Sequence, residues 1–457
     1  MPSMRGIVSA IVAGLVAGCA TVRTYDGELG ATLNQAATGN LDAAVSRLEA
    51  NNKTGKDLLY YFELGMLERM RARYDESQKA WTVAQQRIES GAQSPADLLR
   101  SASSYVVSDK LRTYEAHDYE KVMLTTYMAL NYLAMGRFDD ARVAIKQTHE
   151  LEAQIAVARE KELAEVEAEA KKRGARTSFK ELNGYPVQSI DNPEVNALKN
   201  GYQSALSHYL AGFVYEALNE GGLAAPGYRL ANELQPGKPA LEEALRGLDA
   251  RLSGSNDGMT EVLFIVSAGT APVLRAQQFR LPVPVSNKLI IIPFSFPLLV
   301  PGPFNDDALA LTVGATAGGG QRLPLTRITS IDLMARRSLK DDMPGIMLRA
   351  TARATSAALL QYQAQQHSDR QAGAAAALGA FALASFLQTA DDRTWRTLPG
   401  EVSIARVRLP PGVHEVSLQT YAGEQTARIE VAGRYAVIDF RLLSGRLYVN
   451  APKGGKG

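Results

Sequence analysis

The spacing of apolar residues divides the chain into a helical first part and a β-rich second part. Residues 31–252 carry helix-like apolar periodicity, whereas residues 258–449 contain alternating runs that predict strands with one face on a core, such as Ala436, Ile438, Phe440 and Leu442. The polar stretch Ser253–Gly258 separates the two patterns. We therefore predict an α+β multidomain fold: an N-terminal tetratricopeptide-like α-solenoid, then a mostly antiparallel β domain with a helical hairpin, and a flexible tail over 450–457.

The solenoid prediction depends on a repeated offset. Gly65 stands 16 residues before Trp81, and Gly212 stands 16 residues before Tyr228. Tetratricopeptide repeats place a small residue opposite an aromatic residue so that two helices pack closely, and these matches resemble them. The copies are irregularly spaced, which predicts a degenerate repeat around 94–122. An ordinary helical bundle with coincidental offsets is the alternative.

A long insertion is expected at residues 151–193. The segment Leu151–Lys172 is rich in Glu and Lys and thin in apolar residues, which predicts a solvated helix projecting from the body. A coiled-coil surface for a partner is the alternative. Residues 177–193 contain two prolines and read as a loop.

The β-rich part contains several distinct segments. Glu261–Val266 predicts a buried strand, and Val402–Val431 predicts strand, Pro-Gly turn and strand, resembling small β-sandwich modules. Two helices, one starting at Pro344 and an alanine-rich one over 372–387, form the expected hairpin; interfacial membrane contact is the alternative for the second. The apolar stretch 289–300 is interrupted by prolines, so it cannot be a regular central strand and is expected to face a partner or another domain.

The N-terminus has the layout of an export signal. Residues 1–18 carry Arg5, then an apolar run, then small residues, as in a secretory signal peptide. Val16-Ala17-Gly18-Cys19 resembles a bacterial lipobox, in which the cysteine is acylated and becomes the first residue of the mature chain. Cys19 is the only cysteine in the chain, and residues 19–30 would form a lipidated tether. An uncleaved anchor is the alternative, although the uncharged run is short of the about 20 residues that a spanning helix needs.

Composition excludes several classes of function. Lys and Arg total 50 against 48 Asp and Glu, and this near neutrality argues against nucleic-acid binding. A single cysteine excludes intrachain disulfides and cysteine-based metal sites. The five histidines are scattered without a metal-binding spacing, so we expect no metal and no cofactor apart from the lipid on Cys19.

Catalytic motifs are not found in the sequence. The glycine run 318–320 is followed by Gln321-Arg322 rather than by the Lys of a phosphate loop. Asp118 and Glu120 flank Tyr119 and could serve acid–base chemistry, but such a pair more often caps a helix N-terminus. We therefore expect a protein that binds rather than an enzyme.

Stacked helix pairs usually present a concave groove to a peptide or protein. Tyrosine suits such a groove because it offers a large rigid surface with a polar tip. The residues expected to line it are Tyr60, Tyr61, Tyr114, Asp118, Tyr119, Glu120, Tyr127 and Tyr202. Plain packing in the core is the alternative for each tyrosine.

Four stretches carry a resemblance to a family of outer-membrane lipoproteins of Gram-negative bacteria. They are Asp118–Val122, Ala129–Leu133, Gly269–Pro272 and Asp392–Pro399. The resemblance spans nearly the whole mature chain, and it implies a lipid-anchored protein on the periplasmic face of the outer membrane. Ala20 after the cysteine is consistent with that sorting. Members are often encoded beside lipoprotein activators of peptidoglycan synthases, which implies a link to cell-wall synthesis.

The sequence therefore predicts an interaction scaffold in an envelope complex, with periplasmic or outer-membrane proteins as partners. A cell-wall hydrolase or carbohydrate-binding enzyme is the first alternative. A periplasmic chaperone or assembly factor for an exported polymer is the second.

Overall fold

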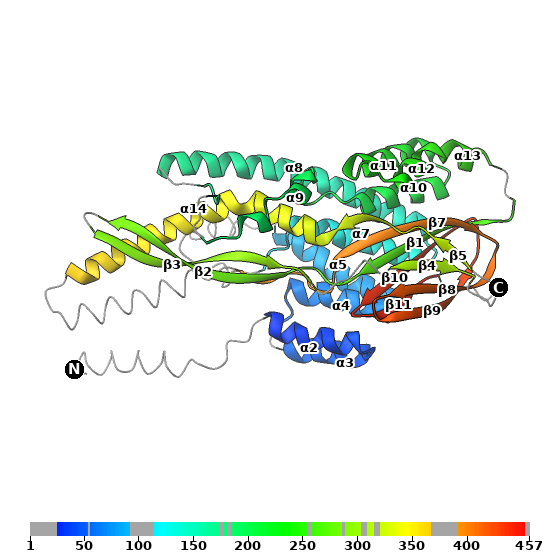
Figure 1. Ribbon diagram of the computed structural model, residues 1–457, viewed down its shortest axis with the longest axis horizontal. Helices are drawn as coiled ribbons and strands as arrows, with labels where there is room; N and C mark the ends of the chain where they lie inside the picture. The colour runs from blue at the N-terminus through cyan, green and yellow to red at the C-terminus, as the bar shows by residue number, and fades with distance from the viewer. Residues whose placement is uncertain are drawn as a thin grey trace.

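The computed structural model describes residues 25–53, 55–91, 114–173, 177–180, 184–254, 257–285, 288–302, 309–314, 320–366 and 391–452. Over these residues the fold is mixed α+β, with helices in the first part and several antiparallel sheets in the second (Figure 1). The helices of the first part are α2 (Tyr25–Ala37), α3 (Leu41–Asn51), α4 (Leu58–Met70), α5 (Tyr74–Gly91), α7 (Asp118–Ala134), α8 (Phe138–Arg173), the 3₁₀ helix η2 (Val187–Ser189), α9 (Pro193–Ala197), α10 (Ala205–Ala217), α11 (Gly221–Leu234), α12 (Pro239–Arg246) and α13 (Leu248–Ser253).

Consecutive helices pack as pairs, and the repeated offset marks their contact points. A Cβ atom added to Gly65 of α4 would lie 2.1 Å from Nε1 of Trp81 on α5, and one added to Gly212 of α10 would lie 2.5 Å from Cδ1 of Tyr228 on α11. Only glycine therefore allows these helices to approach so closely. The expected helix pairs are present at both sites. Part of the expected degenerate repeat, residues 94–113, lies outside the described residues.

The insertion begins as part of one long helix. Helix α8 runs for 36 residues, and most residues beyond Ile155 are exposed, as its charge pattern predicted. The helix is fastened to the body at Arg159, which binds Asp118 on α7 and Asp342 on α14 (Ile331–Gln366). The loop after it folds back, since Tyr185 is buried.

The strands form two sheets and one separate hairpin. The central sheet has the order β11 (Arg446–Asn450), β10 (Tyr435–Leu443), β1 (Thr260–Ala268), β7 (Glu401–Leu409) and β6 (Thr326–Ser330). The outer sheet has the order β5 (Gln321–Leu323), β4 (Ala310–Val313), β8 (Gly412–Thr420) and β9 (Gly423–Val431). The β2–β3 hairpin pairs β2 (Val273–Val285) with β3 (Lys288–Val300).

The central sheet is the middle layer of the molecule. Residues such as Val262 and Phe264 on one face meet the outer sheet, and the rings of Phe264 and Phe440 stack at 5.9 Å. Residues on the other face, such as Leu263 and Val437, join the helices in one hydrophobic cluster that extends from Leu29 to Leu443. The helical and β parts therefore share one core, and a second core lies within the β part between its two sheets.

Several expectations about the β part need correction. The alternating series in β10 has both faces buried, not one, because the helices cover one face of the central sheet and the outer sheet covers the other. β10 also pairs in parallel with β1, not antiparallel. The Pro-Gly turn after β7 does not close a hairpin, since β7 lies in the central sheet and β8 in the outer one. The predicted strand over Glu261–Val266 is confirmed and buried.

Three element boundaries also differ from the prediction. Pro344 lies inside α14 rather than at the start of a helix, because α14 already begins at Ile331. Residues 25–30, expected in a tether, belong to α2, and Asn450, expected in the tail, ends β11. The alanine-rich segment 372–387 lies outside the described residues. Within the described part of the chain, no helix combines the length and hydropathy needed to cross a membrane.

Candidate functional site

Most of the tyrosines predicted to line a groove lie in the core. Tyr60, Tyr114, Tyr119 and Tyr127 are each at most 4% exposed. Their side chains pack against other buried residues, so they cannot line an open groove, and core packing is the correct reading for them. Tyr61 and Tyr202 are half-buried. The ring of Tyr61 lies under the Arg87 guanidinium at 4.7 Å.

The two candidate carboxylates, Asp118 and Glu120, serve the N-terminus of α7. Glu120 accepts a hydrogen bond from the backbone N–H of His117 at 2.9 Å and completes a capping box. Asp118 binds Lys121 at 2.8 Å as well as Arg159. Burial opposes ionisation of Asp118, but the charges of Lys121 and Arg159 outweigh it and lower its pKa. These contacts favour the capping role over the catalytic one.

Glu120 has a second role, which it shares with Glu63 on α4. Glu120 accepts a hydrogen bond from the backbone N–H of Trp395 at 2.6 Å, and Glu63 accepts from the N–H groups of Arg396 at 2.8 Å and Thr397 at 3.1 Å. Both carboxylates are fully buried. Two helices thus bind three successive amides of the segment that leads into β7. We call residues 391–400 the tryptophan segment.

The indole of Trp395 fills the space between the helices. It stacks on Phe62 with 4.5 Å between ring centroids and meets Trp81 edge-on at 6.0 Å. The stretch Asp392–Pro399 is therefore packed against the helical layer. Its burial makes it part of the core rather than a surface for a partner.

The pKa of Glu63 is raised. Burial raises its pKa to about 7, although hydrogen bonds from Thr397, Tyr25 and Arg396 act in the opposite direction. The Tyr25 hydroxyl donates to it at 2.7 Å. Such a carboxyl could exchange a proton near neutral pH, but its surroundings are backbone amides and aromatic rings. The arrangement suits a structural clamp more than acid–base catalysis.

A second buried polar cluster joins helices to the central sheet. Arg69 on α4 binds Asp439 on β10 at 2.8 Å and Asn131 on α7 at 2.6 Å. Beside it Arg441 donates to the carbonyl groups of Ser267 and Thr397. Burial lowers the pKa of Arg441 to about 10, against smaller opposing effects of Tyr127 and Asp439.

Glu216 on α10 organises a third cluster, at the other end of the sheet. It accepts hydrogen bonds from Arg251 at 2.8 Å and from the Tyr228 hydroxyl at 2.7 Å, and it also binds Arg406 of β7. Burial opposes ionisation of Glu216, but these arginines outweigh it and lower the pKa. All its partners are accounted for, which indicates a structural role.

Two histidines far apart in sequence meet between α8 and α10. The rings of His149 and His208 stack with centroids 4.9 Å apart, and Nε2 of His208 lies 3.0 Å from a carboxylate oxygen of Glu152. Burial and the neighbouring His208 lower the pKa of His149. No group of three or more His, Cys, Asp or Glu residues in the described chain is arranged to hold a metal ion.

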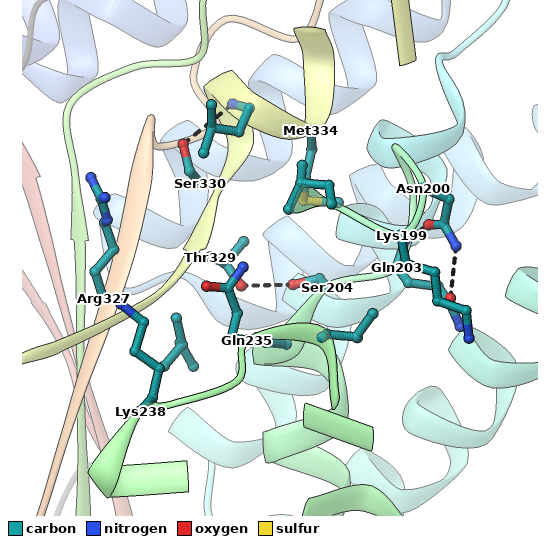
Figure 2. Close-up of a pocket in the computed structure, with 15 residues that line it drawn as sticks. Lys199, Asn200, Gln203, Ser204, Gln235, Lys238, Arg327, Thr329, Ser330 and Met334 are labelled. Carbon is teal, nitrogen blue, oxygen red and sulfur yellow. Dashed lines mark hydrogen bonds between the residues drawn. The ribbon is translucent and has the colours of Figure 1, made fainter. Parts of the chain in front are cut away.

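A pocket opens where the helical part meets β6 and the start of α14 (Figure 2). Figure 2 shows Arg327 and Lys238 on one side and Lys199 with Asn200 and Gln203 on the other. On its floor the hydroxyl groups of Ser204 and Thr329 are 3.0 Å apart. The cavity volume is about 60 Å³.

The pocket lining is basic and polar. It contains Lys199, Lys238 and Arg327 but no Asp, Glu or His; the remaining lining residues are Leu198, Asn200, Gln203, Ser204, Ala205, Leu234, Gln235, Ile328, Thr329, Ser330, Leu333 and Met334. Arg327 binds Glu401 at 2.8 Å, outside this lining. Lys199 and Lys238 form no ion pair with a described residue. A small anionic group would find charge and hydrogen-bond donors here.

The comparisons with known proteins give no match. No protein-family model, curated protein or solved structure matches the chain.

Sequence reasoning missed the pocket and the two glutamates that hold the tryptophan segment. The pocket residues come from three separate segments with no shared motif, so only folding brings them together. Glu63 gives a faint signal, because a charged residue stands in the otherwise apolar run Leu58–Met66. A carboxylate in such a run must find partners once buried.

Proposed function

We propose that this protein is a lipoprotein anchored to the periplasmic face of the outer membrane through Cys19, and that it recruits a partner protein there. The lipobox-like sequence and the position of the single cysteine support the anchor. An acyl chain contributes about 0.8 kcal/mol for each buried CH₂ group, so several chains on one residue hold a soluble body firmly.

The observation that carries the recruiting function is the basic pocket between the segment after α9, the end of α11, and β6. Lys199, Lys238 and Arg327 surround a floor of hydroxyl groups in a cavity that admits one small group. A carboxylate of the partner, either an acidic side chain or a chain terminus, fits that chemistry and size. A hydrolase would instead require a carboxylate or imidazole in the lining as acid or base, so the pocket favours binding.

The helical layer fits the tetratricopeptide class, and we include that class in the proposal. The close contacts of Gly65 with Trp81 and of Gly212 with Tyr228 support it. In such arrays the open face of the helices usually binds the partner. Here the tryptophan segment packs onto α4 and α7, which is why we assign partner recognition to the pocket. A connection with cell-wall synthesis remains part of the proposal through the family resemblance.

Charge reversal tests the pocket. Lys199→Glu combined with Lys238→Glu is expected to reduce recovery of crosslinked partners from whole cells about tenfold or more, because two attractive charges become repulsive. Lys161→Glu is the matched control, since Lys161 is 78% exposed on the projecting part of α8. Undiminished crosslinking by the pocket variant, or turnover of peptidoglycan fragments by the purified protein, would overturn the proposal.

The anchor has its own test. Cys19→Ala is expected to move the protein from the membrane fraction to the soluble periplasmic fraction. An unchanged distribution, or retention of residues 1–18 on the mature protein, would count against lipidation.

A further inference from the structure

Helices α8 and α10 enclose three polar residues, His149, Glu152 and His208, to which the proposed function gives no role. His208 and Glu152 are only 2% and 5% exposed, and Nε2 of His208 lies 3.0 Å from Oε2 of Glu152. The ring of His149 stacks on the ring of His208 with 4.9 Å between centroids. We call these three residues the histidine cluster.

The buried polar atoms of the histidine cluster lack hydrogen-bond partners. Within the described structure, Oε1 of Glu152 and Nε2 of His149 and His208 are buried and form no hydrogen bond. Among the described residues, His208 is also the only basic side chain within ion-pairing distance of Glu152. A carboxylate buried in this way is stabilised when its neighbour gains a proton, because the two groups then carry opposite charges. The geometry therefore favours uptake of a proton between His208 and Glu152.

Helix α7 meets α8 and α10 next to the histidine cluster through uncharged groups. The hydroxyl group of Thr125 accepts a hydrogen bond from Thr148 of α8 at 2.8 Å, and the hydroxyl groups of Thr126 and Ser207 of α10 are 2.8 Å apart. These contacts hold the two helices together without a charge of their own. They do not compensate a charge on the cluster.

The segment before α10 places Tyr202 near the cluster. Burial and then the charge of Glu152 raise the pKa of Tyr202. Charges of Asp118, Arg159 and Asp341 also act on Tyr202, from α7, α8 and α14. Arg159 is already held by ion pairs with acidic residues of α7 and α14. The proton on the histidine cluster is therefore the charge that answers Glu152.

Gln203 connects the histidine cluster to the basic pocket. It lines the pocket, donates to Oε2 of Glu152 at 3.4 Å and accepts from Asn200, another lining residue, at 2.7 Å. Figure 2 shows Asn200 and Gln203 together at one side of the pocket. Ser204 on the pocket floor is the next residue, and α10 leads from it to His208. One side chain thus separates the carboxylate of the cluster from the space inside the pocket.

We propose that the basic pocket and the histidine cluster bind an anion and a proton cooperatively, so that acidification strengthens the binding of a carboxylate in the pocket. The inference rests on the proposed function of the pocket. When the cluster holds no proton, the negative charge of Glu152 lies behind Gln203 and opposes an anion. A proton shared by His208 and Glu152 cancels that charge and frees the amide group of Gln203 to donate to the anion.

The stacked arrangement limits the cluster to one added charge. Burial and the neighbouring His208 lower the pKa of His149, since two charged rings with centroids 4.9 Å apart would repel each other. The proton therefore stays on the side of the cluster that faces Glu152. Coupling between two sites is reciprocal, so an anion in the pocket must also make the cluster easier to protonate.

Acetate tests the first direction of the coupling, on the mature chain carrying Cys19→Ala. Its carboxylate has the proposed chemistry and stays ionised above about pH 6. Binding is followed through the methyl resonance of Met334, a lining residue, assigned by its loss in Met334→Leu. The affinity for acetate is expected to rise about fivefold from about pH 8 to about pH 6, on either side of the ordinary histidine value.

Two glutamate variants show whether the histidine cluster causes this rise. In Glu152→Gln the affinity for acetate should stay level over the same pH range, near the value that the parent protein has at its acidic end. Glu150→Gln is the matched control, because Glu150 is 60% exposed on the same helix. The control should keep the full pH dependence.

The second direction of the coupling is measured without a ligand. Lys199→Glu with Lys238→Glu places two negative charges in the pocket, which should move the titration of the cluster to higher pH, as read from the ring resonances of its histidines. Lys161→Glu with Lys172→Glu should leave the titration unchanged, because both lysines are 78% exposed on the projecting part of α8. Circular dichroism and the unfolding midpoint check that each variant folds.

The outcomes separate this inference from the proposed function. An acetate affinity that falls toward acidic pH would overturn the inference, because the charged rings would then disrupt the pocket. An affinity that is equal at both pH values, or that rises as much in Glu152→Gln, would overturn it too, while leaving the pocket as a binding site. A pocket that takes no acetate, with an unmoved titration in Lys199→Glu with Lys238→Glu, would overturn both the inference and the proposed pocket.

Discussion

Arg69 and Asp439 lie 370 residues apart in sequence and form an ion pair of 2.8 Å with side chains only 1% and 2% exposed. The arginine belongs to α4 and the aspartate to β10, so the pair joins the helical layer to the central sheet. A charge removed from water in this way is tolerable only when its partner is present. The pair therefore ties the folding of one part to that of the other.

Removal of one partner is expected to be costly. Asp439→Ala leaves the Arg69 guanidinium buried without its counter-ion and should destabilise the protein by about 3–5 kcal/mol in urea unfolding. The double variant Arg69→Met with Asp439→Leu should lose less, because Arg69 is then not left buried without its counter-ion. Equal losses would show that the cost is not the uncompensated charge. Glu76→Ala, which removes the exposed pair with Lys79, should leave the midpoint unchanged.

Glu63 should make stability fall as the pH rises. Its folded pKa of about 7 lies above the ordinary 4.5, so between these values the folded protein holds a proton that the unfolded chain has lost. The stability advantage of wild type over Glu63→Gln should therefore shrink by about 3 kcal/mol from pH 4.5 to pH 8 and stay level above that. Urea unfolding of both proteins across this range measures it. Parallel pH curves would contradict the assigned pKa.

His149 should have the opposite effect and make stability fall as the pH drops. Burial and His208 lower its pKa below the ordinary 6.5, so below that pH the unfolded chain takes up a proton that the folded protein resists. Stability should fall as the pH drops from 6.5 through the folded pKa. His149→Asn should flatten this part of the curve. An identical slope in wild type and His149→Asn would refute the prediction.

Replacing Gly65 with a larger residue should destabilise the protein. A Cβ atom there would lie 2.1 Å from the Trp81 indole, so Gly65→Ala must displace the ring and should cost about 1–3 kcal/mol. Gly222→Ala, on α11, meets nothing within 4 Å and should be neutral or stabilising by up to about 1 kcal/mol. Chemical unfolding compares the two. If Gly65→Ala proves as harmless as Gly222→Ala, the close contact is not what the glycine provides.

The sequence alone determined the features that depend on neighbours along the chain. The Gly65 and Trp81 offset located a helix pair, and the apolar run in Glu261–Val266 located a buried strand, because helix and strand periodicity are local properties. The charge pattern after Leu151 identified an exposed helix for the same reason. The capping role of Glu120 could also be weighed from sequence, since its partner His117 lies three residues away.

Only the tertiary structure decided how these elements face one another. From the sequence, Tyr119 and Tyr127 could equally line a groove or lie in the core. Which of the two holds depends on the tryptophan segment and the central sheet, whose residues are far from these tyrosines in sequence. The basic pocket depends in the same way on Lys199 and Arg327, which line it from opposite sides. Apolar periodicity tells which side of a helix is covered, but it carries no information about what covers it, because the hydrophobic effect is non-directional. The identity of that cover comes from long-range packing and from pairs such as Arg69 with Asp439, and these exist only in the folded chain.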